Sequence, residues 1–169
     1  MFTVDLIVEK LNLKPLPKEG GFFAQTYRSE NTIPASALKG RFNGERSLAT
    51  AIYYLLTRDS YSALHRLPGD EVFHFYLGDP VEMLRLRSDG TAEVVVLGSD
   101  ILRGMRPQVI VPGGVWQGSR LKPGGEFGLM GTTMSPGFEF SDCVWPEGKE
   151  LVAQYPQVAE LIRVLLPDN

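Results

Sequence analysis

The chain contains two histidines, and a single glutamate lies between them in the sequence. His65 lies near the end of an apolar segment, a Pro68-Gly69-Asp70 turn signal follows, and Glu71 opens the next apolar segment. A tight turn between two strands brings the side chains before and after it together across a hairpin. An imidazole beside a carboxylate suits general acid–base chemistry, and both groups are also metal ligands.

Strand periodicity decides which side chains accompany this pair. Successive side chains of a strand point to opposite faces, so residues two apart share a face. We therefore expect Tyr61 on the face of His65, and Leu77 on the face of Glu71. His74 has the opposite parity and points outward when Glu71 points inward, unless a bulge intervenes. An outward His74 is expected at the exterior or at a dimer interface, but its place beside Glu71 also makes it a candidate for substrate binding.

Gln117 comes from a later predicted strand and adds an amide to the same interior. The inward set is therefore His65, Glu71 and Gln117. One imidazole, one carboxylate and one amide oxygen, with waters completing the shell, form a candidate site for a divalent metal ion. Such a site is weaker than one with two or three histidines, because an amide oxygen is a poor ligand for zinc or iron. The alternative is a metal-free polar cluster in which the carboxylate is hydrogen-bonded to the imidazole and the amide.

Acid–base chemistry without a metal needs a base and an acid. A histidine oriented by a carboxylate is a suitable general base, and His65 fits that role. Tyr27 and Tyr53 are candidate acid partners, and each is otherwise a wall of the pocket. Arg28 is a candidate for binding an anionic group of a substrate, and Gln117 is a candidate for binding a substrate through its amide.

The segments around these residues indicate an all-β domain. From residue 48 onward, apolar segments alternate with turn signals every 8–12 residues or so, which is typical of a sandwich or barrel. An earlier strand is expected to follow Gly20-Gly21. The later predicted strands are residues 49–56, 61–67, 71–77, 81–87, 92–97, 108–111, 115–121, 127–134 and 138–143.

Short helices are expected at both ends of this series. Thr3 is placed to cap a first helix, and residues 31–46 are expected to form a long loop. An apolar helical face runs from Leu151 to Leu165 and is interrupted at Pro156, which predicts two short helices or one kinked helix packed on the barrel exterior. We expect one domain over residues 1–169, with the barrel core at about 20–145 and the C-terminal helices at about 148–166.

Composition narrows the classes of function. The net charge of −3 disfavours binding to nucleic acid, and the single cysteine, Cys143, excludes an internal disulfide. We interpret Cys143 as a structural thiol. No signal peptide is visible, and no segment approaches the roughly 18 apolar residues that a membrane span needs, so a cytoplasmic location is expected.

The spacing of the candidate residues resembles the two motifs of the cupins. The first cupin motif has two histidines separated by one residue, then a glutamate, then a glycine seven residues later. His65, Glu71 and Gly78 match it, while the second histidine position falls on Leu67. The second motif has Pro-x-Gly, two residues and a histidine. Residues 112–117 match it, with Gln117 in place of the histidine.

The resemblance is more specific to one group, the cupin type 5 family that was catalogued as a domain of unknown function. The segments that carry it are residues 20–29, 62–65, 70–80 and 111–117. It implies an all-β double-stranded β-helix, a jelly-roll barrel like that of the deoxysugar epimerases, and a homodimer. Metal-free epimerases of that shape use a histidine base and a tyrosine acid. The family implies no particular reaction.

Three hypotheses for function stay open. The first is an enzyme that converts a small polar metabolite, such as a sugar derivative, by isomerisation, epimerisation or metal-assisted chemistry. The second is a barrel that binds a small ligand without converting it, which the loss of two motif histidines favours. The third is a degenerate cupin retained for assembly, which a polar interior cluster disfavours because burying unused polar groups costs free energy.

Overall fold

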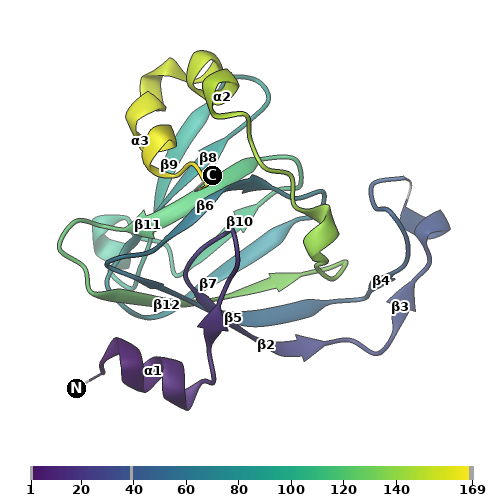
Figure 1. The fold of residues 1–169 in the computed structure, drawn as a ribbon, viewed down its shortest axis with the longest axis horizontal. Coiled ribbons are helices and arrows are strands. Elements are labelled where there is room, and N and C mark those ends of the chain that lie inside the picture. Colours follow the sequence, from purple (N-terminus) through teal and green to yellow (C-terminus); the bar gives the residue numbers. More distant parts are fainter. Residues whose placement is uncertain (1, 39, 168–169) are drawn as a thin grey trace.

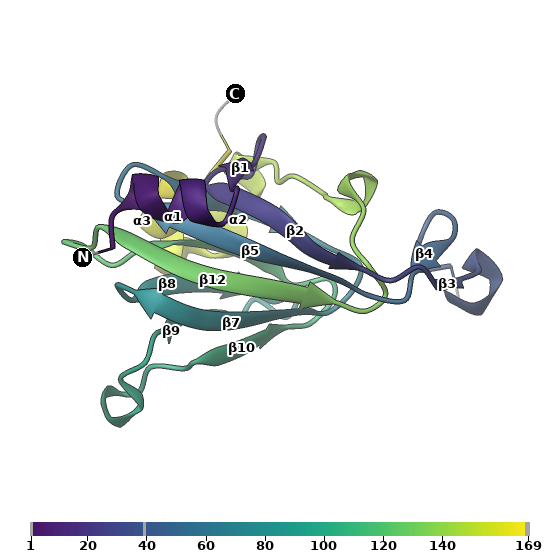
Figure 2. The same ribbon diagram turned by 90° about the horizontal axis from the view of Figure 1, so that it is seen from below.

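The computed structural model describes residues 2–38 and 40–167, and it consists mainly of two antiparallel sheets that face each other (Figure 2). The strands of the larger sheet are, in spatial order, β1 (Lys14–Pro15), β2 (Phe22–Arg28), β5 (Thr50–Thr57), β12 (Phe127–Met134), β7 (Glu71–Gly78) and β10 (Gln108–Val111). Those of the smaller sheet are β6 (Tyr61–Arg66), β11 (Trp116–Leu121), β8 (Val81–Leu86) and β9 (Ala92–Leu97). A ribbon of β3 (Thr32–Ile33) and β4 (Arg46–Ser47) extends from one end.

The chain repeatedly crosses between the two sheets. It passes from β5 to β6, from β7 to β8, and from β10 through β11 to β12. Strands that alternate between facing sheets in this way form a double-stranded β-helix, so the predicted jelly-roll fold is confirmed. The interior between the sheets is filled by apolar side chains, among them Leu56, Phe73, Met83 and Met130.

Helical segments occupy the ends of the chain and some of the connections. The α-helices are α1 (Val4–Lys10), α2 (Gly148–Gln154) and α3 (Ala159–Val164). The 3-10 turns are η1 (Ala35–Leu38), η2 (Ile101–Arg103), η3 (Phe140–Asp142) and η4 (Pro156–Val158). Within the described residues, no helix combines the length and apolar character that crossing a membrane requires.

The first helix covers the outer face of the larger sheet. Thr3 caps it as expected, because its hydroxyl oxygen accepts a hydrogen bond of 3.3 Å from the backbone nitrogen of Leu6. Ile7 is buried against Leu55 and Leu129 of the sheet. The even-numbered residues of β5, such as Leu56, point into the barrel, so the sheet is apolar on both faces here.

The C-terminal helices cover the outer face of the smaller sheet (Figure 1). Tyr155 and Ile162 are buried there against Leu64 and Leu84. The helical pattern breaks at Pro156, which begins η4, as its missing N–H and fixed φ predict. Of the two expected alternatives, two short helices or one kinked helix on the barrel exterior, the structure shows two short helices, α2 and α3, joined by η4.

Bulges in β6 and β7 change which face some side chains occupy, relative to simple alternation. In β6, Gln117 pairs with His65 and Ser119 pairs with Ser62, so β6 contains one extra residue. This bulge turns Tyr61 outward, under the C-terminal helices, and Ser62 inward. The expectation that Tyr61 shares the face of His65 is therefore wrong. A bulge between β7 and β12 likewise places Leu77 on the outer face, against the expectation for that residue.

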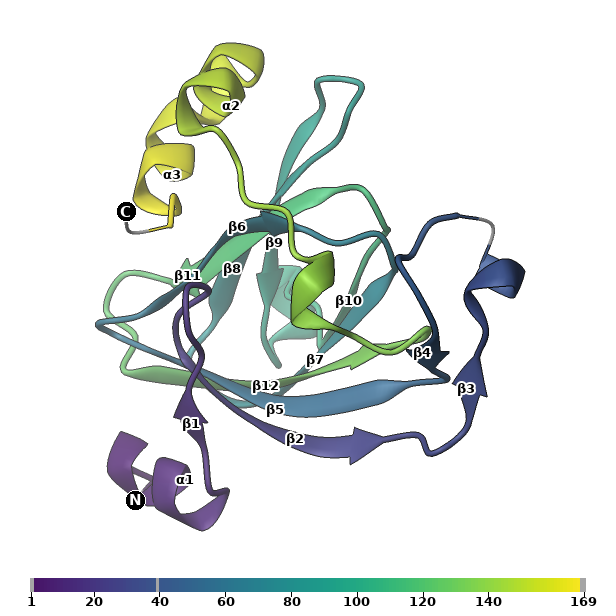
Figure 3. The same ribbon diagram turned by 45° about the vertical axis from the view of Figure 1, so that its right-hand side comes forward.

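The segment after β12 is the one predicted strand that is absent from the described residues. Residues 138–143 form an irregular loop with the turn η3, which crosses the open end of the barrel (Figure 3). The side chain of Arg46 is buried and binds both carboxylate oxygens of Asp142, at 3.1 and 2.5 Å. This ion pair ties the loop to β4, a long-range contact that the apolar pattern of residues 138–143 does not reveal.

Candidate functional site

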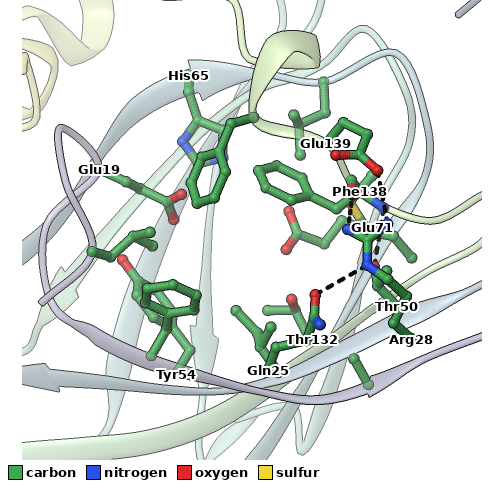
Figure 4. A pocket seen from close by; sticks show the side chains of 17 residues that line it. Glu19, Gln25, Arg28, Thr50, Tyr54, His65, Glu71, Thr132, Phe138 and Glu139 are labelled. Atoms are coloured by element: carbon green, nitrogen blue, oxygen red, sulfur yellow. Dashed lines mark hydrogen bonds and ion pairs between the residues drawn. The ribbon is translucent and has the colours of Figure 1, made fainter. Parts of the chain in front are cut away.

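A cavity opens between the two sheets beneath the 138–143 loop, and its water-accessible volume is about 80 Å³ (Figure 4). Its apolar and aromatic lining consists of Leu16, Phe23, Ala51, Ile52, Tyr54, Leu67, Met134, Phe138 and Phe140. Its polar lining consists of Glu19, Gln25, Arg28, Thr50, His65, Glu71, Thr132 and Glu139. A single water needs about 10–15 Å³ by this measure, so the cavity has room for a small polar molecule.

His65 is buried near the end of β6, with only 2% of its surface exposed. Its Nδ1 lies 2.8 Å from the backbone carbonyl oxygen of Ala63. A carbonyl only accepts hydrogen bonds, so Nδ1 carries the proton and Nε2 presents a lone pair. The indole of Trp145 packs beside the imidazole, with ring centroids 5.9 Å apart. The backbone, rather than a carboxylate as expected, therefore orients this histidine.

Glu71 begins β7 and is also buried. The preceding turn is docked onto the second motif, because Asp70 Oδ1 accepts a hydrogen bond of 2.8 Å from the backbone nitrogen of Gly113. A side chain at Gly113 would collide with the carbonyl of Pro68, so glycine permits this approach. Burial raises the pKa of the Glu71 carboxyl above its ordinary 4.5, and the nearby charge of Glu19 adds to this effect.

Gln117 links the two ionisable side chains from behind the cavity lining. Its Nε2 donates to Glu71 Oε2 at 2.6 Å and lies 3.3 Å from His65 Nε2. With an unprotonated Nε2 and an ionised carboxylate as partners, the amide nitrogen of Gln117 is the atom that donates to both. Its Oε1 is buried without a hydrogen-bond partner among the described residues. The structure thus brings together the three residues of the predicted inward set.

This arrangement bears directly on the predicted metal site. An ion would have to lie between the imidazole lone pair and the carboxylate, where the amide nitrogen of Gln117 now donates. Gln117 would have to turn its amide before Oε1 became a ligand. No group of three His, Cys, Asp or Glu side chains suited to a metal occurs in the described part of the chain. The donor set in this arrangement fits a metal ion poorly.

Tyr27 lies outside the cavity lining, against the expectation that it is an acid partner. Gln25 pairs with Ile52 and Tyr27 pairs with Ala51, so β2 contains an extra residue at Thr26. The bulge reverses which side chains after it point inward. Tyr27 points outward and is 54% exposed, and Arg28 lies in the cavity lining instead. Simple alternation with Gln25 does not anticipate this exchange.

Arg28 lines the cavity as a substrate-binding residue would, but its donors are already engaged. Nε lies 3.4 Å from Gln25 Oε1, and one terminal nitrogen donates to Glu139 Oε1 at 2.7 Å and to Ser47 Oγ at 3.2 Å. The other terminal nitrogen donates to the carbonyl oxygen of Phe138 at 3.1 Å. Arg28 therefore holds the loop over the cavity.

The tyrosine of β5 that reaches the cavity is Tyr54, not the predicted Tyr53. Tyr53 points outward and contacts Tyr76, with ring centroids 6.1 Å apart at 82°. Tyr54 is buried, and its hydroxyl donates to the carbonyl oxygen of Gly20 at 3.0 Å. Burial raises the pKa of Tyr54 well above 10.0, so its proton stays in place.

His74 lies on the outer face of the larger sheet, as its parity predicts. Its ring nitrogens lie 3.4 Å from Gln108 Nε2 and 3.5 Å from Thr133 Oγ1. It does not line the cavity, so its candidate role in substrate binding there is not supported by its position.

Glu19 is the cavity carboxylate that sequence reasoning missed. It lies in the turn between β1 and β2, where Gly20 has a φ of 90° and would collide with Tyr61 if it carried a side chain. The backbone carbonyl of Glu19 accepts from Ala63 at 2.7 Å, and its Oε1 accepts from Ser62 at 3.0 Å. The two glycines at residues 20–21 indicate a tight turn, but they do not indicate that Glu19 in this turn reaches the site.

Cys143 lies at the end of the covering loop and is half-buried. Burial raises the pKa of its thiol to about 12, and the negative charges of Glu19, Glu71 and Asp142 add to this effect. A thiol with this pKa stays protonated near neutral pH, which agrees with a structural rather than a nucleophilic cysteine.

Comparison with solved structures identifies close relatives over the whole chain. A hypothetical protein from Leishmania major superposes with a TM-score of 0.87 at 28% identity, covering 99% of this chain and 100% of that one. A protein from Shewanella oneidensis superposes with a TM-score of 0.86 at 33% identity, covering 100% of both chains. Oxalate decarboxylase from Bacillus subtilis shares the fold, with a TM-score of 0.52 at 12% identity over 94% of this chain and 41% of that one.

Sequence comparison gives the same assignment. An uncharacterised protein of Saccharomyces cerevisiae is 30% identical over 141 residues, which cover 79% of this chain and 70% of the yeast protein. The family described as "Cupin superfamily (DUF985)" matches residues 5–145. With the jelly-roll fold and the two degenerate motifs in place, the chain belongs to this family of the cupin superfamily.

Proposed function

We propose that the chain binds a small polar metabolite, such as a sugar derivative, in the cavity beneath His65 and converts it by proton transfer. The observation that carries this proposal is the convergence of three ionisable side chains from separate elements on one cavity. Glu19 comes from the β1–β2 turn, His65 from β6 and Glu71 from β7. Ionisable groups gathered in an enclosed, partly apolar pocket are a common feature of catalytic sites.

The hydrogen bonds suggest how the roles are divided. His65 Nε2 presents the lone pair of a general base, and Nδ1 is held in one tautomer by Ala63. Glu71 is the carboxylate beside this base and is suited to exchange a proton with the ligand, because burial raises the pKa of its carboxyl above 4.5. It takes the place of the tyrosine acid that the epimerase resemblance implies, since the hydroxyl proton of Tyr54 is engaged by Gly20.

Binding without conversion is the alternative, and a specific contact favours it. Gln117 already engages both Nε2 of His65 and Oε2 of Glu71. A base whose lone pair is occupied must release that contact, of 3.3 Å, before it accepts a proton from a ligand. If the contact persists with a ligand bound, the site recognises the ligand and leaves it unchanged.

Proton exchange distinguishes the two functions without knowledge of the reaction. Sugar derivatives that bind are incubated with the protein in D₂O, and NMR follows loss of carbon-bound hydrogen from the ligand. We expect exchange with the wild type and with His74→Ala, whose histidine lies outside the cavity, and none with His65→Ala. Exchange that survives His65→Ala contradicts the assigned base. Binding with no exchange in any variant supports the non-catalytic alternative.

We further propose that the chain forms a homodimer and is located in the cytoplasm. Support for the dimer comes from the family resemblance and from exposed side chains on the outer face and edge of the larger sheet, where Tyr76 and Ile110 are about half exposed. Light scattering of the purified chain tests the assembly, and a monomer at all concentrations contradicts it.

A further inference from the structure

The polar groups at one end of the cavity present hydrogen-bond acceptors. The hydroxyl of Tyr54 donates to the carbonyl oxygen of Gly20, so its proton is not free for a ligand. His65 likewise donates its Nδ1 proton to the carbonyl oxygen of Ala63. The carboxylate of Glu19 is an acceptor by nature, and it already takes the one proton that Ser62 offers. A ligand group that binds at this end must therefore supply hydrogen-bond donors.

The same end of the cavity carries negative charge. Glu19 and Glu71 reach into the cavity from opposite sides, below His65 (Figure 4). Two carboxylates that face each other in a poorly solvated space repel, and a cation between them removes that repulsion. Arg28 does not serve as this cation, because its donors are engaged by Glu139, Gln25 and neighbouring groups at the other end.

Aromatic side chains complete the environment. Phe23, Phe138 and Phe140 line the cavity and contact one another edge to face, with ring centroids 6.4 Å apart for Phe23–Phe140 and 5.1 Å apart for Phe138–Phe140. Aromatic faces attract organic cations through their quadrupole. A bare divalent ion is a poorer fit, since the described residues contain no group of three metal-ligating acidic, His or Cys side chains.

From this geometry we infer that the ligand of the cavity carries a protonated amine, which binds between Glu19 and Glu71 with its N–H groups directed at the acceptors around them. An ammonium group combines positive charge with three donors, which is what this end of the cavity lacks. The inference rests on the proposed function, because it assumes that the cavity binds a metabolite. It narrows that metabolite to an amine-bearing one, such as an amino sugar.

Matched pairs of probes isolate the contribution of the amine. Glucosamine is compared with glucose, and ethanolamine with ethylene glycol, by calorimetry or ligand-observed NMR on the full chain. We expect an amine of at least one pair to bind about tenfold or more tightly than its neutral partner, a difference of about 1.4 kcal/mol. Glu19→Gln and Glu71→Gln preserve shape and hydrogen-bond acceptance while removing charge, and we expect each to abolish the preference.

The control is Glu9→Gln, which removes a carboxylate from the exposed face of α1 and should leave the preference intact. Melting temperatures establish that each variant is folded. A neutral partner that binds as tightly as its amine overturns the inference but leaves the proposed function standing. An amine preference that survives both Glu19→Gln and Glu71→Gln also overturns the inference and leaves the proposed function standing. If none of the four probes binds, the amine inference is wrong, and a wider metabolite screen then decides the proposed function.

Discussion

Gln117 donates a 2.6 Å hydrogen bond from its side-chain amide to Oε2 of Glu71, within 3.3 Å of Nε2 of His65. The amide thus stands where the second cupin motif has a histidine, and it offers N–H donors in place of a lone pair. Two of the residues around it, His65 and Glu71, are potential metal ligands. The residue at position 117 therefore decides whether this cluster is held together by hydrogen bonds or by an ion.

Restoring the histidine should create a metal site. Gln117→His places two imidazoles and a carboxylate around one point, a donor set that zinc accepts. We expect the variant to retain a divalent metal after loading and desalting, with at least about tenfold higher affinity than the wild type. Metal analysis and calorimetry measure this difference. Gln117→Leu is the control and should gain no metal binding. Near-stoichiometric metal in the wild type, lost in His65→Ala, would contradict this account and restore the predicted metal site.

The raised pKa of Glu71 predicts how stability depends on pH. The unfolded chain releases this proton near the ordinary pKa of 4.5, whereas the folded chain holds it to higher pH. Ionisation of Glu71 therefore costs the folded state free energy progressively as pH rises above 4.5, and costs nothing well below it. Glu71→Gln removes that cost and still accepts a hydrogen bond from Gln117.

Thermal unfolding across the pH range checks this sign. We expect Glu71→Gln to melt at a higher temperature than the wild type near pH 8, with the difference shrinking toward zero at acidic pH. Glu9→Gln, on the exposed face of α1, should show no such trend. A stabilisation of Glu71→Gln that is constant, or that grows as pH falls, would show that the pKa of Glu71 is not raised.

The loop over the cavity depends on the ion pair between Arg46 and Asp142. Their side chains are 3% and 6% exposed, so removing one partner leaves a buried charge without compensation. Arg46→Met is expected to lower the free energy of unfolding by about 3 kcal/mol. Arg58→Met breaks the exposed pair with Glu126 and should cost less than about 1 kcal/mol. Urea denaturation measures both values, and equal losses would contradict the anchoring role of Arg46.

The strands that have a clear local pattern lie where the sequence predicts them. Strands such as Ala92–Leu97 and Phe127–Met134 lie where alternation and turn signals place them, because each is bounded by glycine or proline turns. His65, Glu71 and Gln117 meet as predicted. Their positions follow from the two docked motif turns, which sequence spacing identifies.

The side chains that the sequence does not place correctly lie where the backbone departs from regular alternation. The bulge at Thr26 exchanges Tyr27 for Arg28 in the cavity, and no residue type in β2 marks it. The pattern of β5 does not indicate whether Tyr53 or Tyr54 faces inward, and in the structure Tyr54 does. Glu19 reaches the site through a long-range contact with Ser62, 43 residues away in the chain, which a local pattern does not encode.

Blocking the cavity beneath His65 shows whether it binds a small polar metabolite. Ile52→Trp adds bulk to the lining, whereas Tyr53→Phe changes the next residue on the outer face of the same strand. Each purified protein is incubated with a metabolite extract, separated from unbound compounds and analysed by mass spectrometry. We expect the wild type and Tyr53→Phe to retain the same small polar compound and folded Ile52→Trp to lose it. Retention of that compound by all three proteins, or of no compound by the wild type, would show that the cavity is not a metabolite site.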